Sequence, residues 1–173
     1  MILREKDLPH EELVGLARDC LSICSGCGVP PPSVNSDIAA ARELGIRRVH
    51  LPMDILRTAD IRGFGLVGAS VHSPEEAKEA EKLGAHYLIA GHVFSTACKI
   101  GEPRGTDFLR SVCSAVDIPV YGVGGIVPSN YREVLDAGAA GAASMSSVMR
   151  ADDPSEIIEG MRPPVGAWGL LSR

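Results

Sequence analysis

Aromatic residues and long apolar runs are both scarce in this chain of 173 residues. Phe, Tyr and Trp make up only 4% of it, and no stretch approaches the roughly 18 uninterrupted apolar residues of a membrane span. The first residues, Met1 to Lys6, also lack the pattern of a signal peptide. We therefore expect a cytoplasmic protein with no membrane partner.

A lysine- or arginine-rich run is missing too, and the net charge is -5. Nucleic acids and anionic membranes attract clustered positive charge, so this balance argues against both as main partners. A local basic pocket remains compatible with the composition. We expect the partners of the chain to be small molecules.

The cysteines do not form a metal-binding pattern. Their number, five, is odd, and Cys20, Cys24 and Cys27 are loosely spaced without a companion histidine or a second cysteine pair. We expect reduced, mostly buried thiols and no protein-bound metal.

With 45% apolar residues the chain can build a real core, and we expect one domain over residues 1–162 with an irregular tail over 163–173.

Strand-like and helix-like segments alternate along the whole chain. Ser73 followed by Pro74 and two acids marks the clearest helix start, and Asp153 before Pro154 marks another. About seven β/α units of this size predict a parallel sheet covered on both faces. The expected strands lie near residues 3–7, 32–34, 47–51, 65–69, 85–90, 118–122 and 141–145, and the expected helices near 13–21, 38–44, 55–61, 74–84, 107–116, 128–137 and 154–161.

This alternation favours an α/β fold of the TIM type, a (β/α) barrel. A closed barrel needs eight strands, and only about seven can be counted here, the first of them short. A flavodoxin-like open sheet is the second possibility, although it usually has fewer strands. We expect a TIM-type barrel that lacks the first strand and helix.

The most reactive stretch follows the strand predicted over residues 85–90. His92, Thr96, Cys98 and Lys99 come directly after it, at the strand end where such folds place their chemistry. An imidazole there can take up and return a proton, whereas the alternative is a histidine bonded to a neighbouring carbonyl. Cys98 is most simply a polar wall of the pocket, and Lys99 either binds phosphate or is solvated.

Two further strand ends carry groups that suit a phosphate. Gly124 and Gly125 follow one strand, and Ser146 and Ser147 follow the next. Glycine lets the backbone approach an anion, and amides at a helix start favour its charge. A glycine pair alone is equally explained by a tight turn, but its occurrence beside the serines predicts a phosphate site.

Other polar residues stand at the remaining strand ends. Arg4 and Lys6 have the period-two spacing of residues on one strand face. We therefore expect both at the mouth of the pocket, where their charges would attract an anion. The alternative is that both side chains are simply solvated. Asn35 and Ser70 are candidates for orienting substrate. Candidates for a magnesium site are few, because the relevant loops offer only Ser36 and an isolated Asp54. His50 and His72 also lie at strand ends and are expected to support the substrate-contacting residues or the fold.

Six of these segments together resemble the superfamily of thiamine-phosphate synthases and TenI-type thiazole tautomerases. They occur in the same order and with sensible spacing over nearly the whole chain. The resemblance implies a TIM-type barrel that binds a small phosphorylated thiazole. The segments are Leu3–Leu8, Asn35 with Val49–Leu51, Ser70–Ser73, Gly91–Lys99, Gly124–Ile126 and Ser144–Ser146.

Two departures separate the branches of this superfamily. Synthases usually carry Asn-Asp where this chain has Asn35-Ser36, and that aspartate helps hold the magnesium that neutralises pyrophosphate. They also have Gly-Pro-Val-Phe and Thr-x-Thr-Lys, where this chain has His92 as the second residue and Cys98 before Lys99. Both changes resemble the tautomerase.

By resemblance we therefore predict a thiazole tautomerase, an isomerase. His92 would move the proton that aromatises the thiazole carboxylate phosphate, while Gly125 and Ser146, with help from Lys99, would hold the phosphate. No cofactor is expected. The alternatives are a thiamine-phosphate synthase, a transferase that would need Mg²⁺, and a catalytically inactive relative that binds the thiazole phosphate.

The amino end of the chain also differs from the superfamily. Its members have another strand and helix before the segment that matches Leu3–Leu8, and without them the barrel would have open edges. We expect either that the native start lies upstream of Met1 or that a homo-oligomer covers the opening.

Overall fold

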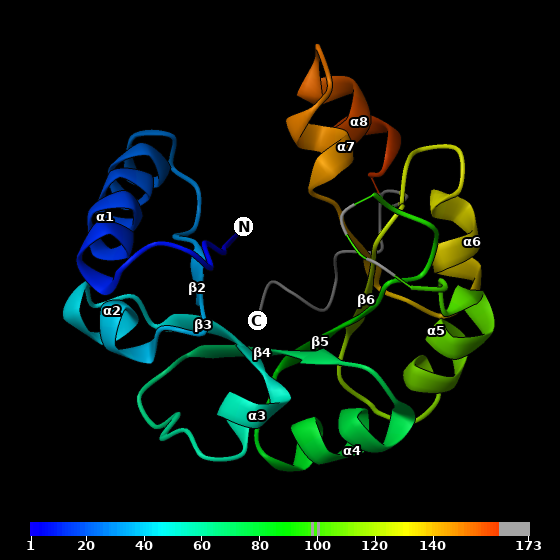
Figure 1. Ribbon diagram of the computed structural model, residues 1–173, viewed down its shortest axis with the longest axis horizontal. Helices are drawn as coiled ribbons and strands as arrows, with labels where there is room; N and C mark the ends of the chain where they lie inside the picture. The colour runs from blue at the N-terminus through cyan, green and yellow to red at the C-terminus, as the bar shows by residue number, and fades with distance from the viewer. Residues whose placement is uncertain (98, 100, 163–173) are drawn as a thin grey trace. The chain divides into compact units, whose positions relative to one another are not determined.

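The computed structural model describes residues 1–97, 99 and 101–162, so the tail expected over residues 163–173 lies outside it (Figure 1). The chain forms two compact units. The first comprises Met1–Ser70 with Lys82–His86, and the second comprises Val71–Glu81 with the chain from Tyr87 onward. The single domain expected over residues 1–162 stays a prediction.

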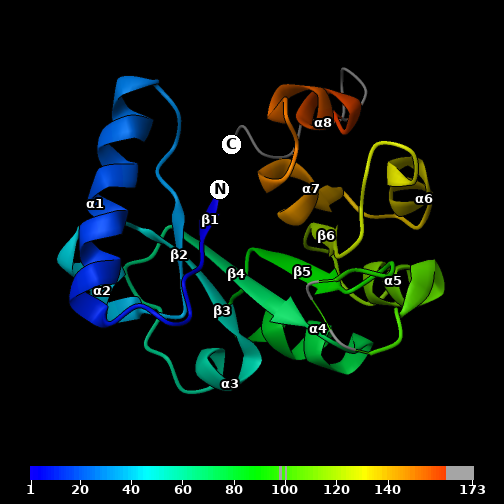
Figure 2. The same ribbon diagram turned by 45° about the horizontal axis from the view of Figure 1, so that its top comes forward.

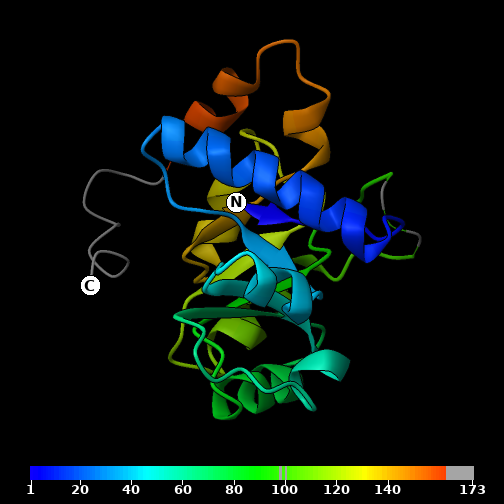
Figure 3. The same cartoon turned by 90° about the vertical axis from the view of Figure 1, so that its left-hand side faces the viewer.

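The first unit alternates short parallel strands with helices. Strands β1 to β4 lie side by side in that order, and Figures 1 and 2 show α1 and α2 along the same side of β2. Figure 3 shows α1 along its length. The elements are β1 (Ile2–Leu3), α1 (His10–Gly26), β2 (Ser33–Asn35), α2 (Ile38–Glu43), β3 (Arg48–Pro52), α3 (Met53–Leu56) and β4 (Leu66–Val71).

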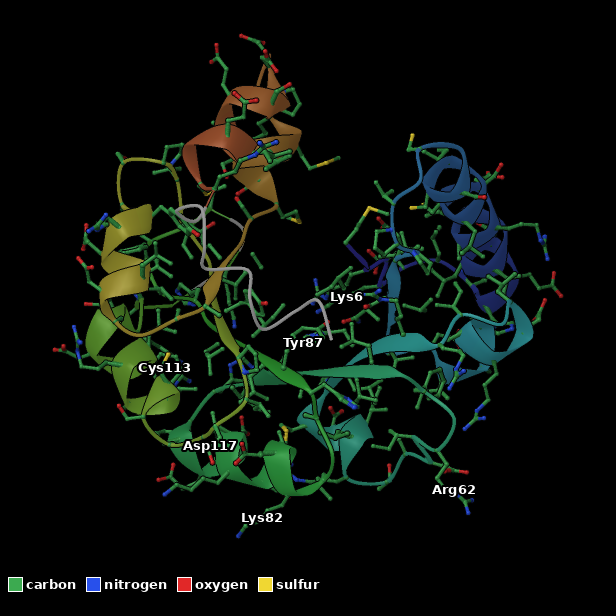
Figure 4. All side chains as sticks on the ribbon, turned by 180° about the vertical axis from the view of Figure 1, so that it is seen from behind. Lys6, Arg62, Lys82, Tyr87, Cys113 and Asp117 are labelled. Atoms are coloured by element: carbon green, nitrogen blue, oxygen red, sulfur yellow. The ribbon has the colours of Figure 1, made fainter. Side chains whose placement is uncertain are left out.

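The second unit continues the alternation. Strands β5, β6 and β7 are parallel and in sequence order, and α5 lies beside both α6 and β6 (Figures 1 and 2). Tyr87 at the start of β5, labelled in Figure 4, packs edge-on against Tyr121 of β6 with 6.0 Å between ring centres. The elements are α4 (Pro74–Lys82), β5 (Tyr87–Gly91), α5 (Gly105–Cys113), β6 (Val120–Val123), α6 (Tyr131–Asp136), β7 (Gly141–Ala143), α7 (Ser146–Met149) and α8 (Pro154–Gly160).

The central strands are buried and apolar. Val34, Val49, Val67 and Leu88 are at most 1% exposed, as expected for parallel strands that have both faces covered. No helix in the described residues is both long enough and apolar enough to cross a membrane.

The strand order excludes the flavodoxin-like alternative. That fold places its first strand between the second and third, whereas here β2 pairs with both β1 and β3. The chain has the α/β fold of the TIM type, with seven strands in its described residues where a closed barrel has eight.

The cysteines only partly match the expectation. Cys20, Cys24, Cys27 and Cys113 are free thiols, but only Cys24 is buried, so the prediction of mostly buried thiols is wrong for the described residues. Cys24 belongs to the buried face of α1 with Leu13, Val14 and Ala17, whereas Cys27 is the exposed residue that caps the end of this helix.

Candidate active site

Apart from those in the loop after β5, the candidate residues fall into one group in each unit. The first-unit edge group lies at or just beyond the carboxyl ends of β1 to β4, and the glycine–serine cluster lies beyond β6 and β7 in the second unit. The first group consists of Arg4, Lys6, Asn35, Ser36, His50 and Ser70, and the second of Gly124, Gly125, Ser144, Ser146 and Ser147.

Within the first-unit edge group, His50 and Ser70 form a bonded pair. His50 is 3% exposed, and its Nε2 lies 2.8 Å from the Ser70 hydroxyl on the neighbouring strand. Burial, and to a smaller extent the charge of Arg4, lowers the pKa of His50 to about 4. The imidazole is therefore neutral near pH 7, where it fixes the Ser70 hydroxyl at the end of β4. The sequence marked His50 as a supporting residue without indicating this partner.

Arg4 and Lys6 do not share a strand face, so that expectation is wrong. Strand β1 ends at Leu3, and both residues belong to the exposed irregular segment before α1, in which Figure 4 labels Lys6. The pairing of β1 with β2 extends only over Ile2 and Leu3, opposite Ser33 and Val34. The charge of Arg4 contributes to the lowered pKa of His50.

A tight turn after β2 holds Asn35 and Ser36. The Asn35 side-chain amide donates to the Ser36 hydroxyl over 2.7 Å, and the Ser36 backbone amide donates to the His50 carbonyl over 3.0 Å. Ser36 adopts the left-handed conformation with φ of 66°, a region in which Asn and Asp are the most common residues after glycine. The turn thus presents a hydroxyl where a carboxylate would also fit the backbone.

The donor set at this edge does not fit a magnesium ion. Magnesium prefers carboxylate oxygens, yet Asp37 already accepts from the Ala40 amide at 2.8 Å and lies 2.7 Å from His10. Although burial raises it, these hydrogen bonds leave the pKa of Asp37 below its ordinary value. Asp54 lies in the first turn of α3 and is exposed. Within the part of the chain that the structure describes, no three His, Cys, Asp or Glu side chains are grouped to hold a metal.

In the second unit, the glycine pair after β6 is pressed against the loop that follows β5. A Cβ on Gly124 would lie 2.9 Å from the His92 Cα, and one on Gly125 would lie 2.9 Å from the Phe94 Cβ. Both glycines have positive φ, at 99° and 64°. The glycines are thus required by close packing of two loops.

The carbonyls of this turn are occupied by protein donors. Gly124 accepts from the Phe94 amide at 3.0 Å, and Gly125 accepts from the Asn130 side-chain amide at 3.0 Å. The carbonyl of Ile126 accepts from the hydroxyl of Ser147 at 3.3 Å. Carbonyl oxygens repel anions, so their engagement with the protein favours an anion on the amide side of the turn.

Two serines connect this turn to the end of β7. The hydroxyls of Ser144 and Ser147 bond to each other, and both reach the Ile126 carbonyl. Ser146 is the first residue of α7 and is half-buried. The structure therefore brings the glycine pair and the predicted serines into one cluster, with Ser144 as its link.

His92 is turned into its own loop. Its side chain is buried, with the residue 7% exposed, and Nε2 donates to the Gly101 carbonyl over 3.3 Å. The sequence named this arrangement as the alternative to proton transfer. The geometry thus gives His92 a role in holding the loop over residues 92–104.

The base of this loop is closed by residues that the sequence did not single out together. The Arg104 guanidinium donates to the His72 carbonyl over 2.6 Å, and the Arg104 amide donates to the His92 carbonyl over 3.0 Å. The Nδ1 of His72 in turn lies 3.2 Å from the Gly91 carbonyl. Arg104 follows no strand and belongs to no periodic pattern, so sequence reasoning had no signal for it.

Of the other predicted residues, Thr96 is half-buried and Lys99 is exposed. The Lys99 amide lies 3.5 Å from the Thr96 carbonyl, which folds this stretch back on itself. Cys98 lies outside the described residues.

Fold and site together define an α/β protein of the TIM type whose strand ends carry two candidate anion-binding groups. Comparison with known proteins narrows this class. The family model described as thiamine monophosphate synthase matches residues 1–148. The chain therefore belongs to that family.

Individual relatives agree with this assignment. A protein of Natronomonas pharaonis named thiamine-phosphate synthase is 32% identical, over 94% of this chain and 83% of its own length. One of Moorella thermoacetica with the same name is 38% identical, over 94% of this chain and 80% of its own length. The solved structure of thiamine phosphate pyrophosphorylase from Pyrococcus furiosus has a TM-score of 0.80 and 34% identity, covering 92% of this chain and 78% of that one.

These relatives overturn the prediction of a thiazole tautomerase, and with it the isomerase class. Proteins between 32% and 38% identical to the chain are named thiamine-phosphate synthase, which favours a transferase. The prediction relied on a few substituted positions, His92 above all. Because the His92 ring is bound to a carbonyl of its own loop, its presence does not require proton-transfer chemistry.

Proposed function

We propose that this chain is a transferase of the thiamine-phosphate synthase type, which joins a hydroxymethylpyrimidine pyrophosphate to a thiazole phosphate and releases pyrophosphate. The observation that carries this proposal is the similarity to proteins of that name over 94% of the chain. The engaged carbonyls of the glycine turn support it, because they suit a phosphate group on one substrate.

Under this proposal the glycine–serine cluster binds the phosphate of the thiazole. The amides of Gly124 and Gly125 and the helix start at Ser146 supply hydrogen-bond donors, and Lys99 supplies positive charge. Thr96 contacts the remainder of the substrate. His92 is a positioning residue, because its bond to the Gly101 carbonyl holds the loop that carries Thr96 and Lys99.

The first-unit edge group binds the pyrimidine pyrophosphate under the same proposal. Arg4 and Lys6 attract its negative charge, while Asn35 and Ser70 orient it through hydrogen bonds. The bond from His50 to the Ser70 hydroxyl supports this role, because it fixes the hydroxyl before substrate arrives.

The test is an assay of the purified chain with both substrates, with thiamine phosphate and released pyrophosphate measured together. Ser147→Ala removes the tie between the serines and the Ile126 carbonyl, so we expect about a tenfold rise in KM for the thiazole phosphate, equivalent to roughly 1.4 kcal/mol. Ser25→Ala, at an exposed position of α1, is the matched control and should not change KM. Thiazole phosphate binding without product at any magnesium concentration would refute the proposal.

A second candidate is a relative that binds thiazole phosphate without turnover. The observation that favours it is the lack of a magnesium donor set in the described residues, since the departure of pyrophosphate is assisted by a cation. It predicts saturable binding of the thiazole phosphate together with no release of pyrophosphate. The same assay distinguishes the two candidates.

A further inference from the structure

The turn after β2 raises a question that the family assignment does not answer. A pyrophosphate group carries several negative charges, and proteins commonly meet them with a divalent cation held by carboxylates. In this chain Ser36 occupies the turn. The carboxylate of the next residue, Asp37, already accepts a hydrogen bond from the Ala40 amide and bonds to the His10 ring. The carboxylate needed for a cation is therefore unavailable at this strand end.

The other carboxylates near this edge belong to exposed residues. Glu5 and Asp7 lie in the exposed segment with Arg4 and Lys6, and Asp54 is exposed in α3. Among residues 1–97, 99 and 101–162, none of these joins a group of three donors that could hold a metal. An anion at this edge would therefore meet neutral hydroxyl donors and the positive charges of Arg4 and Lys6.

We propose that the first-unit edge group binds a pyrophosphate group directly, through Arg4 and Lys6 together with the hydroxyls of Ser36 and Ser70, without a divalent cation held by the protein. This deepens the proposed function and rests on it for the identity of the substrate. A guanidinium supplies fixed positive charge and paired donors to phosphate oxygens.

The geometry of the neutral donors agrees with this proposal. The Ser36 hydroxyl accepts from the Asn35 amide at 2.7 Å, which leaves its own proton for an acceptor. The Ser70 hydroxyl is held by the buried His50 at 2.8 Å. The two hydroxyls thus lie directly after β2 and near the end of β4, and the two cations lie in the segment that follows β1.

The test uses inorganic pyrophosphate as the probe, titrated calorimetrically into the whole chain in EDTA and then in excess magnesium. We expect binding in EDTA, with a Kd that changes by less than about threefold in magnesium. Arg4→Gln should weaken binding at least about tenfold under both conditions, because it removes a direct charge contact. Binding by the unmodified chain only in magnesium, or no binding at all, would overturn the proposal, as would binding that Arg4→Gln leaves unchanged.

A gain-of-function variant provides the matched comparison. Ser36→Asp places a carboxylate in a backbone conformation that Asp tolerates, so its binding should weaken about tenfold in EDTA and recover in magnesium. Ser36→Asn fits the same backbone without adding charge. It loses the hydroxyl, so its affinity is not the comparison; the ratio of its Kd values in EDTA and in magnesium should stay within about threefold, as for the unmodified chain. If Ser36→Asn also acquired magnesium dependence, the carboxylate would not be the deciding group and the proposal would fail.

Failure of this binding mode and failure of the proposed synthase function would give different results. Pyrophosphate binding that is independent of magnesium, combined with no formation of thiamine phosphate, would support the binding mode and refute the synthase. Product formation that strictly requires magnesium, with no binding in EDTA, would support the synthase and refute the binding mode.

Discussion

Burial and a hydrogen bond together constrain the protonation state of His50, although the sequence gives this residue little prominence. Burial on β3 and a short contact to Ser70 define it, and both come from the pairing of β3 with β4. His92 is the opposite case, because its place after a strand suggested chemistry whereas its ring is bound to the Gly101 carbonyl. At this scale, residue type suggests what a side chain can do, and its neighbours determine which possibility is realised.

The pKa of His50 makes a prediction about stability. Because burial lowers it from 6.5 to about 4, the unfolded chain binds a proton in this range that the folded chain does not, so stability falls as the pH drops through it. From about pH 7 to about pH 5 the expected loss is about 2 kcal/mol from this group alone. The measurement is urea unfolding at both pH values for the unmodified chain and for His50→Gln.

His50→Gln removes this titration, so it should lose about 2 kcal/mol less than the unmodified chain over the same pH interval. His10 acts in the opposite direction, because its bond to Asp37 raises its pKa, but it is present in both proteins and cancels in the comparison. An equal pH dependence in both proteins would contradict a neutral buried His50.

At the scale of elements, the sequence predicted the helix starts that depend on local capping. Ser73 accepts from the Glu76 amide at 3.1 Å, which confirms it as the predicted cap. Asp153 accepts from the Ser155 amide at 2.8 Å at the start of α8, so the helix start predicted there is confirmed as well. Helix α6 begins at Tyr131 and not at Pro128. The reason is that the Asn130 side chain accepts from the Val127 amide and donates to the Gly125 carbonyl, which holds the preceding residues in a turn.

The loops after β5 and β6 make a prediction about the glycine pair. Gly125 and Gly45 have nearly the same conformation, with φ of 64° and 66°, but only Gly125 has close neighbours at its missing Cβ. Gly45→Ala should cost about 1–2 kcal/mol of folding free energy from backbone strain alone. Gly125→Ala should cost about 1–3 kcal/mol more, because its Cβ meets Phe94 and the Ser95 carbonyl.

Urea unfolding of both variants measures this difference, and the shared φ makes Gly45→Ala the control for strain. Equal destabilisation of the two variants would mean that the loops separate without cost. In that case the glycines would not be needed for loop packing, and a phosphate would be the remaining reason for them.

At the scale of the whole molecule, the fold class was predictable and the activity was not. Alternation of strands and helices gave a TIM-type fold, which the strand order in each unit and the similarity to the Pyrococcus furiosus structure confirm. The predicted activity was wrong because it depended on a few substituted residues, whereas the chain is similar over 94% of its length to a protein named thiamine-phosphate synthase.

The homo-oligomer expected from the sequence stays a prediction, and the second unit supplies a physical reason for it. Strand β7 is the last in the sheet order of the described residues, and Met145, Met149 and Ile158 nearby are at least 50% exposed. Unpaired strand edges and exposed apolar residues favour association. Light scattering after size exclusion should give a mass above the 18.2 kDa of one chain.

Met149→Lys should shift that equilibrium toward monomer, because it places a charge at the most exposed apolar side chain among the described residues. Ile23→Lys, on α1 in the first unit and 66% exposed, is the matched control and should leave the mass unchanged. A monomeric unmodified chain at working concentration would refute the prediction.

The sequence by itself determined the alternation of elements, the capped helix starts and the choice of glycines and serines at two strand ends, because these depend on patterns within a few neighbouring residues. Only the tertiary structure decided that His50 is paired with Ser70, that His92 is bonded within its loop, and that Asp37 is committed to His10. Contacts between residues far apart in sequence depend on strand register and loop path, and neither leaves a local pattern in the chain.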